Sequence, residues 1–492
     1  MTSATIPSAV ERTASTATTG PSFLRPTTLL IVYIGLLLVL PSRLVVPGLG
    51  AAGTPAQIWG LLLLILWGLT RLMPAALPRG WPARLTIVVF FVTGMTSYAA
   101  AWLRGVPTVE GHGADRYLIA VLSSAGVALT AMDAPATRAQ LDRILMAACW
   151  FGGFMSVVGI GQYVTHKDLS TYIKVPGLKY NRELVGLSVR SVHAAFDRVA
   201  GTALHYIEFG AVVTLLLPIA LHYAIHTPPG RKRNWRWALV AVFATAAPLS
   251  IARSATLGLV LGLFMLMSVW RPRFVAIGLF TSLLALTAMK FAFPGLLGTI
   301  RALFTYWNQD SSITARTTDY STVGQYFSER PWFGRGGGTF IPGPYITLDN
   351  QYLGTLVAGG IVTLVGVIAV FLSPFLIGRH IRRYGTDAET RHLGQALAAS
   401  GLITVVLSGT FDSLAFPTFT GLLFVIVGAS GALWRLNLKE GQVSAAARDP
   451  QILREQRDYF RWVPKEIRRE PRPVDPAPFV PGARAAHAAH RQ

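Results

Sequence analysis

The sequence is short of charged residues, and above all of acidic ones. Charged residues make up 14% of the 492 residues, and 44 lysines and arginines stand against only 23 acids. A soluble chain of this length normally carries about 25% charged residues. The shortage argues against a soluble protein of several domains.

Cysteine is nearly absent, with Cys149 as the single copy. One cysteine forms no disulfide within the chain, which excludes a disulfide-stabilised scaffold. We also see no cluster of cysteine and histidine with ligand spacing, so we expect neither a bound metal nor a cofactor. The glycine-rich run FGRGGGTF (333–340) lacks the Lys-Ser/Thr pair of a phosphate-binding loop. We expect it to be a turn and, with PGP at 342–344, a flexible segment.

Apolar residues are abundant: they make up 52% of the chain, and the mean hydropathy is +0.46. Apolar runs recur along the whole chain, and each is long enough for a helix to cross the ~30 Å core of a bilayer. We predict an all-α, polytopic membrane protein with about 12 transmembrane helices. The predicted spans are 27–46, 55–73, 83–103, 115–132, 141–164, 203–225, 235–252, 255–270, 273–293, 350–376, 393–411 and 414–434.

Basic residues indicate how the predicted helices are oriented. They gather in the loops after the second, sixth, eighth and tenth spans and in the tail from Arg435 onward. Cytoplasmic loops carry such an excess, so we place these loops and both termini in the cytoplasm. The net charge of +21 is therefore expected of a membrane protein and does not indicate nucleic acid as a partner.

Three regions follow from this orientation. We expect residues 1–26 to be a disordered cytoplasmic N-terminus and 27–434 to be the transmembrane domain. The tail, 435–492, is basic and rich in proline, and we expect it to be disordered, cytoplasmic and close to membrane lipids.

Two predicted outer, periplasmic-side loops are long, at 165–202 and 294–349. Loops of this length are uncommon unless they are functional or disordered. Both carry basic and aromatic residues. Either they are amphipathic segments lying on the outer leaflet, or they form a cationic vestibule for an anionic ligand.

Ionisable residues at the mouths of membrane spans are costly and usually functional. Arg253 lies at the turn between the seventh and eighth spans, where the alternative is an arginine that snorkels at a helix end. Glu208 lies one to two turns into the sixth span, with His205 on the same face and Arg198 just outside it. A purely structural pairing of Glu208 with an arginine is the alternative there.

Asp349 and Asn350 open the tenth span. Asp349 would suit general-base chemistry, but an aspartate here would also cap the helix. Asp412 would equally cap the last span. Outward-facing arginines beside a carboxylate suit a pyrophosphate ligand and the activation of a hydroxyl.

Five stretches in this order resemble the O-antigen ligase and O-antigen polymerase superfamily of bacterial envelopes. They are RVAGTALHYIEFGAVVTLLLPIAL (198–221), LSIARSATLGLVLGLF (249–264), SSITARTTDYSTVGQYFSERPWFGRGGGTF (311–340), LDNQYLGTLVAGGIVTLVG (348–366) and FDSLAFPTFTGLLF (411–424).

The resemblance implies a multi-pass glycosyltransferase of the inner membrane. Such proteins move a glycan from an undecaprenyl-pyrophosphate carrier to a glycan or lipid acceptor on the outer face, without metal and with inversion. By motif, Arg253 and Arg316 resemble the pyrophosphate-binding arginines of the family. Arg198, Arg335 and His205 are further candidates for substrate binding.

One departure concerns the tenth span, because family ligases commonly have His-Asn where this chain has Asp349-Asn350. The resemblance then implies Asp349 as the base, with Glu208 as the next candidate and Asn350 holding the acceptor or the loop. Ligase and polymerase both stay open. A transporter or flippase is the rival, and it predicts charges near the midplane and broken helices in both halves of the chain.

Overall fold

The computed structural model describes residues 25–72, 82–181, 190–193, 196–293, 295–298, 301, 311–341 and 345–446. The chain divides into two units, Met1–Arg435 and Leu436–Gln492. Of the second unit, the description covers only the end of the last helix. The first unit contains every other described element.

Helices make up most of the described chain, which confirms the predicted helical class. They are α2 (Pro26–Leu38), α3 (Pro55–Arg71), α4 (Ala83–Leu103), α5 (Thr108–Asp133), α6 (Arg138–Thr165), α7 (Tyr206–His226), α8 (Arg231–Leu249), α9 (Arg253–Met267), α10 (Pro272–Ala292), α12 (Ser311–Glu329), α13 (Gln351–Tyr384), α14 (Ala388–Leu407) and α15 (Pro417–Ala446), with the short 3₁₀ helices η2 (Gly50–Gly53), η3 (Leu169–Tyr172) and η6 (Ser413–Ala415).

Strands are few and short. β1 (Leu44–Val45) pairs with β2 (Lys179–Tyr180), and β3 (Arg190–His193) pairs with β4 (Phe196–Arg198), both antiparallel. The first long predicted loop therefore holds η3 and three of these strands, and the second holds α12.

Six helices among the described residues are long and apolar enough to cross a membrane. They are α4, α6, α7, α10, α13 and the Pro417–Leu438 part of α15, while α2, α3 and α9 are apolar but shorter. This agrees with a membrane protein. The number of twelve spans and the orientation of the two long loops stay predictions.

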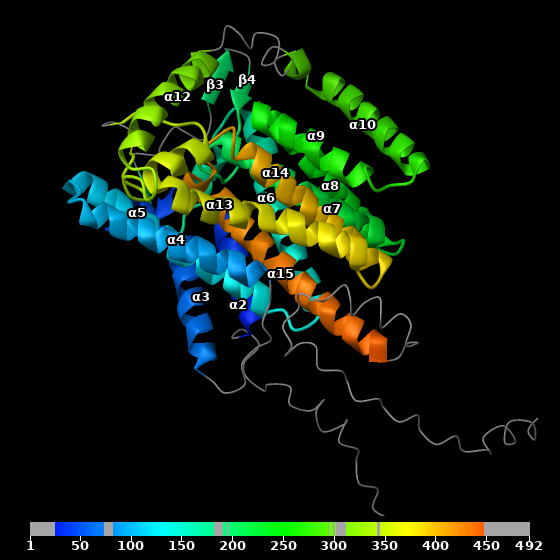
Figure 1. Ribbon diagram of the computed structural model, residues 1–492. Coiled ribbons are helices and arrows are strands. Elements are labelled where there is room, and N and C mark those ends of the chain that lie inside the picture. The colour runs from blue at the N-terminus through cyan, green and yellow to red at the C-terminus, as the bar shows by residue number, and fades with distance from the viewer. Residues whose placement is uncertain are drawn as a thin grey trace, which may run out of the picture. The chain divides into compact units, whose positions relative to one another are not determined.

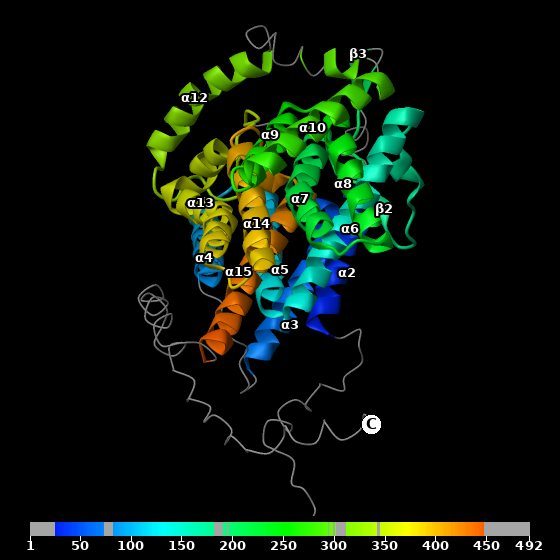
Figure 2. The ribbon, with the colours of Figure 1, turned by 90° about the vertical axis from the view of Figure 1, so that its right-hand side faces the viewer.

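α7 lies inside the helix bundle of the first unit (Figures 1 and 2). Nearly all of α7 is buried, and it contacts α6, α8, α9 and α14. α10 is the opposite case: of its residues only Met289 is buried, and its leucines and phenylalanines are exposed at the edge of the bundle. Because lipid tails are as apolar as a protein core, such a surface suits a helix that faces lipid.

α13 was predicted as one continuous span, but it is broken at Gly360, where φ is 63° and ψ is −169°. A break leaves backbone groups without partners inside the helix. The segment 331–336 supplies them. The N–H groups of residues 361–362 donate to the carbonyl oxygens of residues 331–332 at 2.9 and 3.1 Å, and the N–H groups of residues 335–336 donate to the carbonyl oxygens of 357–358 at 3.1 and 2.6 Å.

The glycine-rich run 333–340 is tightly packed, so the expectation that it is flexible was wrong. Gly336 has φ +114°, and a Cβ built on it would lie 2.3 Å from the Cβ of Ala101 on α4. A Cβ on Gly338 would lie 2.3 Å from the carbonyl oxygen of Gly113 on α5. Glycine is required here because the backbone must lie against α4 and α5 while it bridges the break in α13. Residues 342–344 lie outside the described residues.

We expect Gly336→Ala to lower the free energy of unfolding by about 1–3 kcal/mol, because it adds a Cβ at a positive φ and against α4. Gly354→Ala is the matched control, since nothing lies within 4 Å of a Cβ at this helical position. It should be neutral or slightly stabilising. Thermal unfolding of the purified protein in detergent measures both. Equal unfolding temperatures for the two variants would contradict the packing described above.

Candidate functional site

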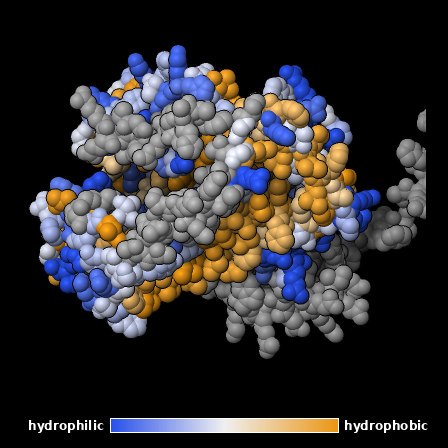
Figure 3. Space-filling model, turned by 90° about the horizontal axis from the view of Figure 1, so that it is seen from above, coloured by the Kyte–Doolittle hydropathy of each residue, from blue (hydrophilic) through white to orange (hydrophobic). Residues whose placement is uncertain are grey.

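The candidate site lies at one end of the bundle, where the starts of α7, α9 and α13 meet the connection between α14 and α15. This end also carries β4 and α12, at the top of Figure 1, and α12 is at the top of Figure 2 as well. Figure 3 views the bundle from this side and shows a band of hydrophobic residues flanked by hydrophilic ones. The N–H of Gln351 donates to the carbonyl oxygen of Ser408 at 2.9 Å and ties α13 to the connection.

Asn350, rather than Asp349, caps α13. The Oδ1 of Asn350 accepts hydrogen bonds from the N–H groups of Tyr352 at 2.9 Å and Leu353 at 3.3 Å. Its Nδ2 donates to the carbonyl oxygen of Gly409 at 3.1 Å. The amide of Asn350 is thus used for structure, and the exposed carboxylate of Asp349, one residue earlier, is not part of the cap.

Asp412 is a second carboxylate beside Asp349. It lies half-buried in the α14–α15 connection and makes no side-chain capping bond to η6. Burial and, to a smaller extent, the negative charge of Asp349 together raise the pKa of Asp412 to about 6. The two carboxylates therefore interact, although 62 residues of sequence separate them and include the whole of α13 and α14.

Glu208 is fully buried and accepts hydrogen bonds from three backbone N–H groups. Its Oε1 accepts from Thr418 at 2.6 Å and Phe419 at 3.2 Å, and its Oε2 accepts from Leu204 at 2.8 Å. A carboxylate at a helix start satisfies amides that have no partner inside the helix and meets the positive end of the helix dipole. Glu208, not Asp412, thus caps α15. These bonds support a structural role for Glu208, which holds the start of α15 in position. The partners of its carboxylate are backbone amides, whereas the structural alternative had expected an arginine.

His205 and Arg198 are brought together by Tyr206. His205 caps α7, with its Nδ1 accepting from the N–H of Ile207 at 3.4 Å. Its ring centroid lies 4.1 Å from that of Tyr206 and 5.8 Å from that of Phe416 in the α14–α15 connection. The guanidinium of Arg198 lies 4.6 Å from the centroid of the Tyr206 ring and donates to its hydroxyl.

Arg253 is half-buried at the first position of α9 and next to this group. Ala252 and Ala255 pack against Tyr206. Ile251 has φ +48°, a conformation that is rare for a β-branched residue. Strain of this kind persists only where the surroundings impose it, and it is often found at functional sites. The turn before Arg253 is therefore held in a defined position against the start of α7.

Residues 238–368 match the family model described as O-antigen ligase. The resemblance found in the sequence is thereby confirmed over this segment, which supports a membrane glycan transferase of the O-antigen ligase or polymerase type. No curated protein matches the chain. The O-antigen ligase segment runs from α8 into α13 and contains Arg253, Arg335 and Asp349. Arg198 and Asp412 lie outside it, and only the folding of the chain brings them to the same end of the bundle.

Arg335 belongs to the O-antigen ligase segment, and through a tyrosine of the second long loop it is connected to Glu110 at the start of α5. Its Nη2 donates to the hydroxyl of Tyr345 at 2.9 Å, and that hydroxyl donates to the Oε1 of Glu110 at 2.6 Å. The guanidinium also lies 5.2 Å from the ring centroids of both Tyr326 and Tyr345. These contacts fix the second long loop to the bundle. Arg316 lies on α12, and its side chain is outside the described part of the structure.

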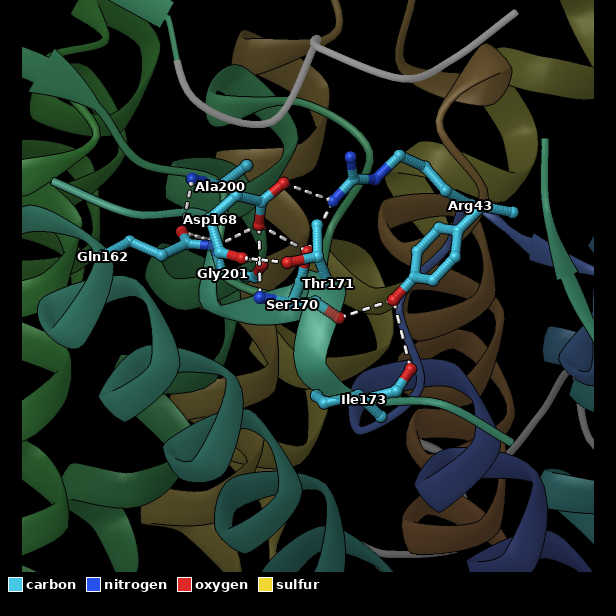
Figure 4. A network of polar contacts seen from close by, with 9 residues as sticks. Arg43, Gln162, Asp168, Ser170, Thr171, Ile173, Ala200 and Gly201 are labelled. Atoms are coloured by element: carbon cyan, nitrogen blue, oxygen red, sulfur yellow. Dashed lines mark hydrogen bonds and ion pairs between the residues drawn. The ribbon is translucent and has the colours of Figure 1, made fainter. Parts of the chain in front are cut away.

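A buried polar network supports the segment that leads into α7, and sequence reasoning missed it (Figure 4). Arg43 is only 2% exposed, and its Nη2 donates to the Oδ2 of Asp168 at 2.8 Å. The Oε1 of Gln162 accepts from the N–H of Gly201 at 2.7 Å, and its Nε2 donates to the carbonyl oxygen of Gly201 at 3.0 Å. The available signal was Gln162 in the apolar second half of a predicted span, since a polar group there must find a partner.

We expect Glu208→Gln to lower the free energy of unfolding by about 1–3 kcal/mol, because an amide N–H₂ would face a backbone N–H that now donates to the carboxylate. Glu389→Gln, at an exposed carboxylate in the first turn of α14, is the control and should change stability little. Thermal unfolding of both purified variants tests this. If Glu208→Gln unfolds like the native chain but loses glycan transfer, Glu208 acts in the chemistry.

Proposed function

We propose that this protein moves an oligo- or polysaccharide from an undecaprenyl-pyrophosphate carrier to an acceptor hydroxyl on the outer face of the cytoplasmic membrane. The O-antigen ligase match supports the class of reaction. The neighbouring carboxylates Asp349 and Asp412 are the observation that carries the chemistry. Phe416, in the same connection as Asp412, lies against His205, which stacks on Tyr206 beside Arg198.

The donor would be held by arginines. Arg253, Arg316 and Arg198 each offer a planar guanidinium that can bind a pyrophosphate bidentately. Positive charge supplied in this way would make a metal unnecessary for binding the leaving group. Arg335 is occupied by its tyrosines, so its proposed part is to hold the second long loop over the donor. The hydrophobic band on the face seen in Figure 3 suits a polyprenyl chain that arrives through the bilayer.

The acceptor would be activated by the carboxylate pair. The acceptor oxygen attacks the anomeric carbon, the bond from that carbon to the pyrophosphate oxygen breaks, and undecaprenyl pyrophosphate leaves with the electron pair. Asp349 takes the hydroxyl proton and shares it with Asp412. A carboxyl with a pKa of about 6 suits this task near neutral pH. Asn350, as the helix cap, would hold Asp349 in position.

The proposal requires the twelve-span topology, with the loops 165–202 and 294–349 on the outer side. The candidate site lies at the helix ends next to these loops, which is consistent with that orientation. The same site would serve a ligase with a lipid-glycan acceptor and a polymerase with a growing glycan. The break in α13 is a feature that the transporter alternative predicts. However, the chain's own residues 331–336 fill it, and they leave its backbone groups paired.

We expect Asp349→Asn and Asp412→Asn each to slow glycan transfer by about 10²–10⁴-fold, because each removes one half of the proton-accepting pair. Thermal stability should stay near that of the native chain, since Asn350 and Glu208 provide the helix caps. The native rate should fall as the pH is lowered through about 6, because Asp412 must be ionised to share the proton. In Asp349→Asn the residual rate should fall at a lower pH, since the neighbouring negative charge is gone. Full activity of both variants would remove the pair from the mechanism.

We expect Arg253→Ala and Arg316→Ala to abolish transfer with normal protein level and membrane insertion. Arg253→Lys should restore it only in part, because lysine keeps the charge but loses the planar fork. Arg273→Ala, at an exposed arginine in the same O-antigen ligase segment, is the control and should transfer normally. Unchanged transfer in Arg253→Ala would leave Arg253 as an arginine that snorkels at a helix end.

A further inference from the structure

Three histidines meet at the ends of α7 and α14 that lie away from the candidate functional site. His222 and His226 are four residues apart on α7, and His392 lies near the start of α14. One ring nitrogen from each lies within 4.8 Å of the other two. The expectation of no histidine cluster with ligand spacing was therefore wrong, because it overlooked the pair His222-x-x-x-His226 in the printed sequence.

The hydrogen bonds of the cluster leave lone pairs on its nitrogens. The Nδ1 of His226 lies 3.0 Å from the carbonyl oxygen of His222, which only accepts, so this Nδ1 carries the proton and Nε2 carries the lone pair. A backbone carbonyl that fixes the ring in this way is the usual outer partner of a metal-bound histidine. The Nδ1 atoms of His222 and His392 lie 3.0 Å apart, and two neutral rings can share only one proton there.

The cluster also has polar capacity that the described residues do not satisfy. The Nε2 atoms of His222 and His392 are buried and have no hydrogen-bond partner. His222 is fully buried and His392 is 8% exposed. Buried polar atoms are nearly always paired in native proteins, and an unpaired one calls for an explanation such as an ion or water. The described residues offer no partner at either Nε2 atom.

We propose that His222, His226 and His392 bind one transition-metal ion, with Zn²⁺ as the ion that fits best. Zinc accepts neutral imidazole ligands at about 2.0–2.1 Å, and three protein ligands with a water in the fourth position are a common arrangement. Small rotations of the three rings close their spacing onto one ion. If the Nδ1 atoms of His222 and His392 both bind the ion, the ring that carried its proton on Nδ1 carries it on Nε2 instead. Both rings then stay neutral.

Cationic groups also face the cluster, and they limit its affinity. Three arginines act on the histidines by their charge, and each also has a partner of its own: Arg138 with Asp142 at 2.9 Å, Arg236 with Thr227 and the carbonyl oxygen of Tyr223, and Arg382 with the carbonyl oxygen of Val269 at 3.4 Å. Their charges oppose a dication. The ion would therefore be held by coordination bonds rather than by the local field, which favours a metal with strong affinity for imidazole over Mg²⁺ or Ca²⁺.

The ion would act on structure and not on glycan transfer. His222 lies 17 residues along α7 from His205, or about 25 Å. Contacts between α7 and α14 continue between the two ends, where the Oγ of Ser400 donates to the carbonyl oxygen of Leu215 at 2.8 Å. A metal would fasten these helices at one end, while their other ends carry Glu208 and the connection to Asp412.

The test is Zn²⁺ binding by the full-length protein, purified in detergent and stripped with a chelator. Calorimetric titration should show one Zn²⁺ per chain, and His226→Gln should weaken binding by about 100-fold or more, since it removes a direct ligand. His112→Gln, at an exposed histidine on α5, is the control and should bind as the native chain does. Co²⁺ should give the visible absorption of a tetrahedral site in the native chain and not in His226→Gln.

A second measurement separates this site from the proposed transferase. Chelation should lower the unfolding temperature of the native chain but not that of His226→Gln, and it should leave the initial rate of transfer unchanged at a permissive temperature. If His226→Gln does not fold, His392→Gln replaces it. The proposal is overturned if Zn²⁺ does not bind, or if it binds the histidine variants as tightly as the control. Neither result bears on glycan transfer, and a chain without transferase activity would still test the metal site.

Discussion

The buried carboxylate of Glu208 is the interaction on which the geometry of the candidate site depends. It joins three amides from two distant parts of the chain, the segment before α7 and the start of α15. An unpaired charge at this depth would be very costly, so the two segments must stay together as long as the carboxylate is ionised. His205 and Tyr206 lie at the start of α7, and Phe416 lies just before α15. Their positions relative to one another follow from this bond set.

A second constraint is the exchange of backbone partners around the break in α13. Residues 331–336 lie against the break because four backbone hydrogen bonds and a run of glycines bring them there. The second long loop is thereby anchored at its C-terminal end. Asn350 caps the same helix, so Asp349 is held at its mouth with a carboxylate that is not part of the cap. The anchored loop and the helix cap together hold the exposed Asp349 at a rigid position, as a functional site at a helix end requires.

The two ends of α7 and α14 carry different kinds of polar group. One end has carboxylates and arginines in connections and helix starts, of which Asp349 is exposed and Asp412 and Arg253 are half-buried. The other end has three histidines, two of them buried. A metal ion bound at the histidine end and the proposed reactive carboxylates at the other end would be connected by the same two helices. Such a division would let one end be rigid without placing an ion among the groups that we propose bind the donor.

The sequence by itself determined the class of the protein: apolar runs of membrane length require helices, because hydrocarbon leaves no other way to pair the backbone. It also pointed to Arg253 and Asp349, since charges at the mouths of such helices stand out against an apolar background.

Only the tertiary structure decided which partners each of these groups has. Asp412 became the neighbour of Asp349, Asn350 the cap, Glu208 a buried acceptor of backbone bonds and His392 the third member of a histidine cluster. These pairs are far apart in sequence, and no periodicity or local propensity encodes a contact between the ends of different helices. That information lies in how the helices pack, because packing sets which side chains share a low-dielectric environment and which backbone groups still need a partner.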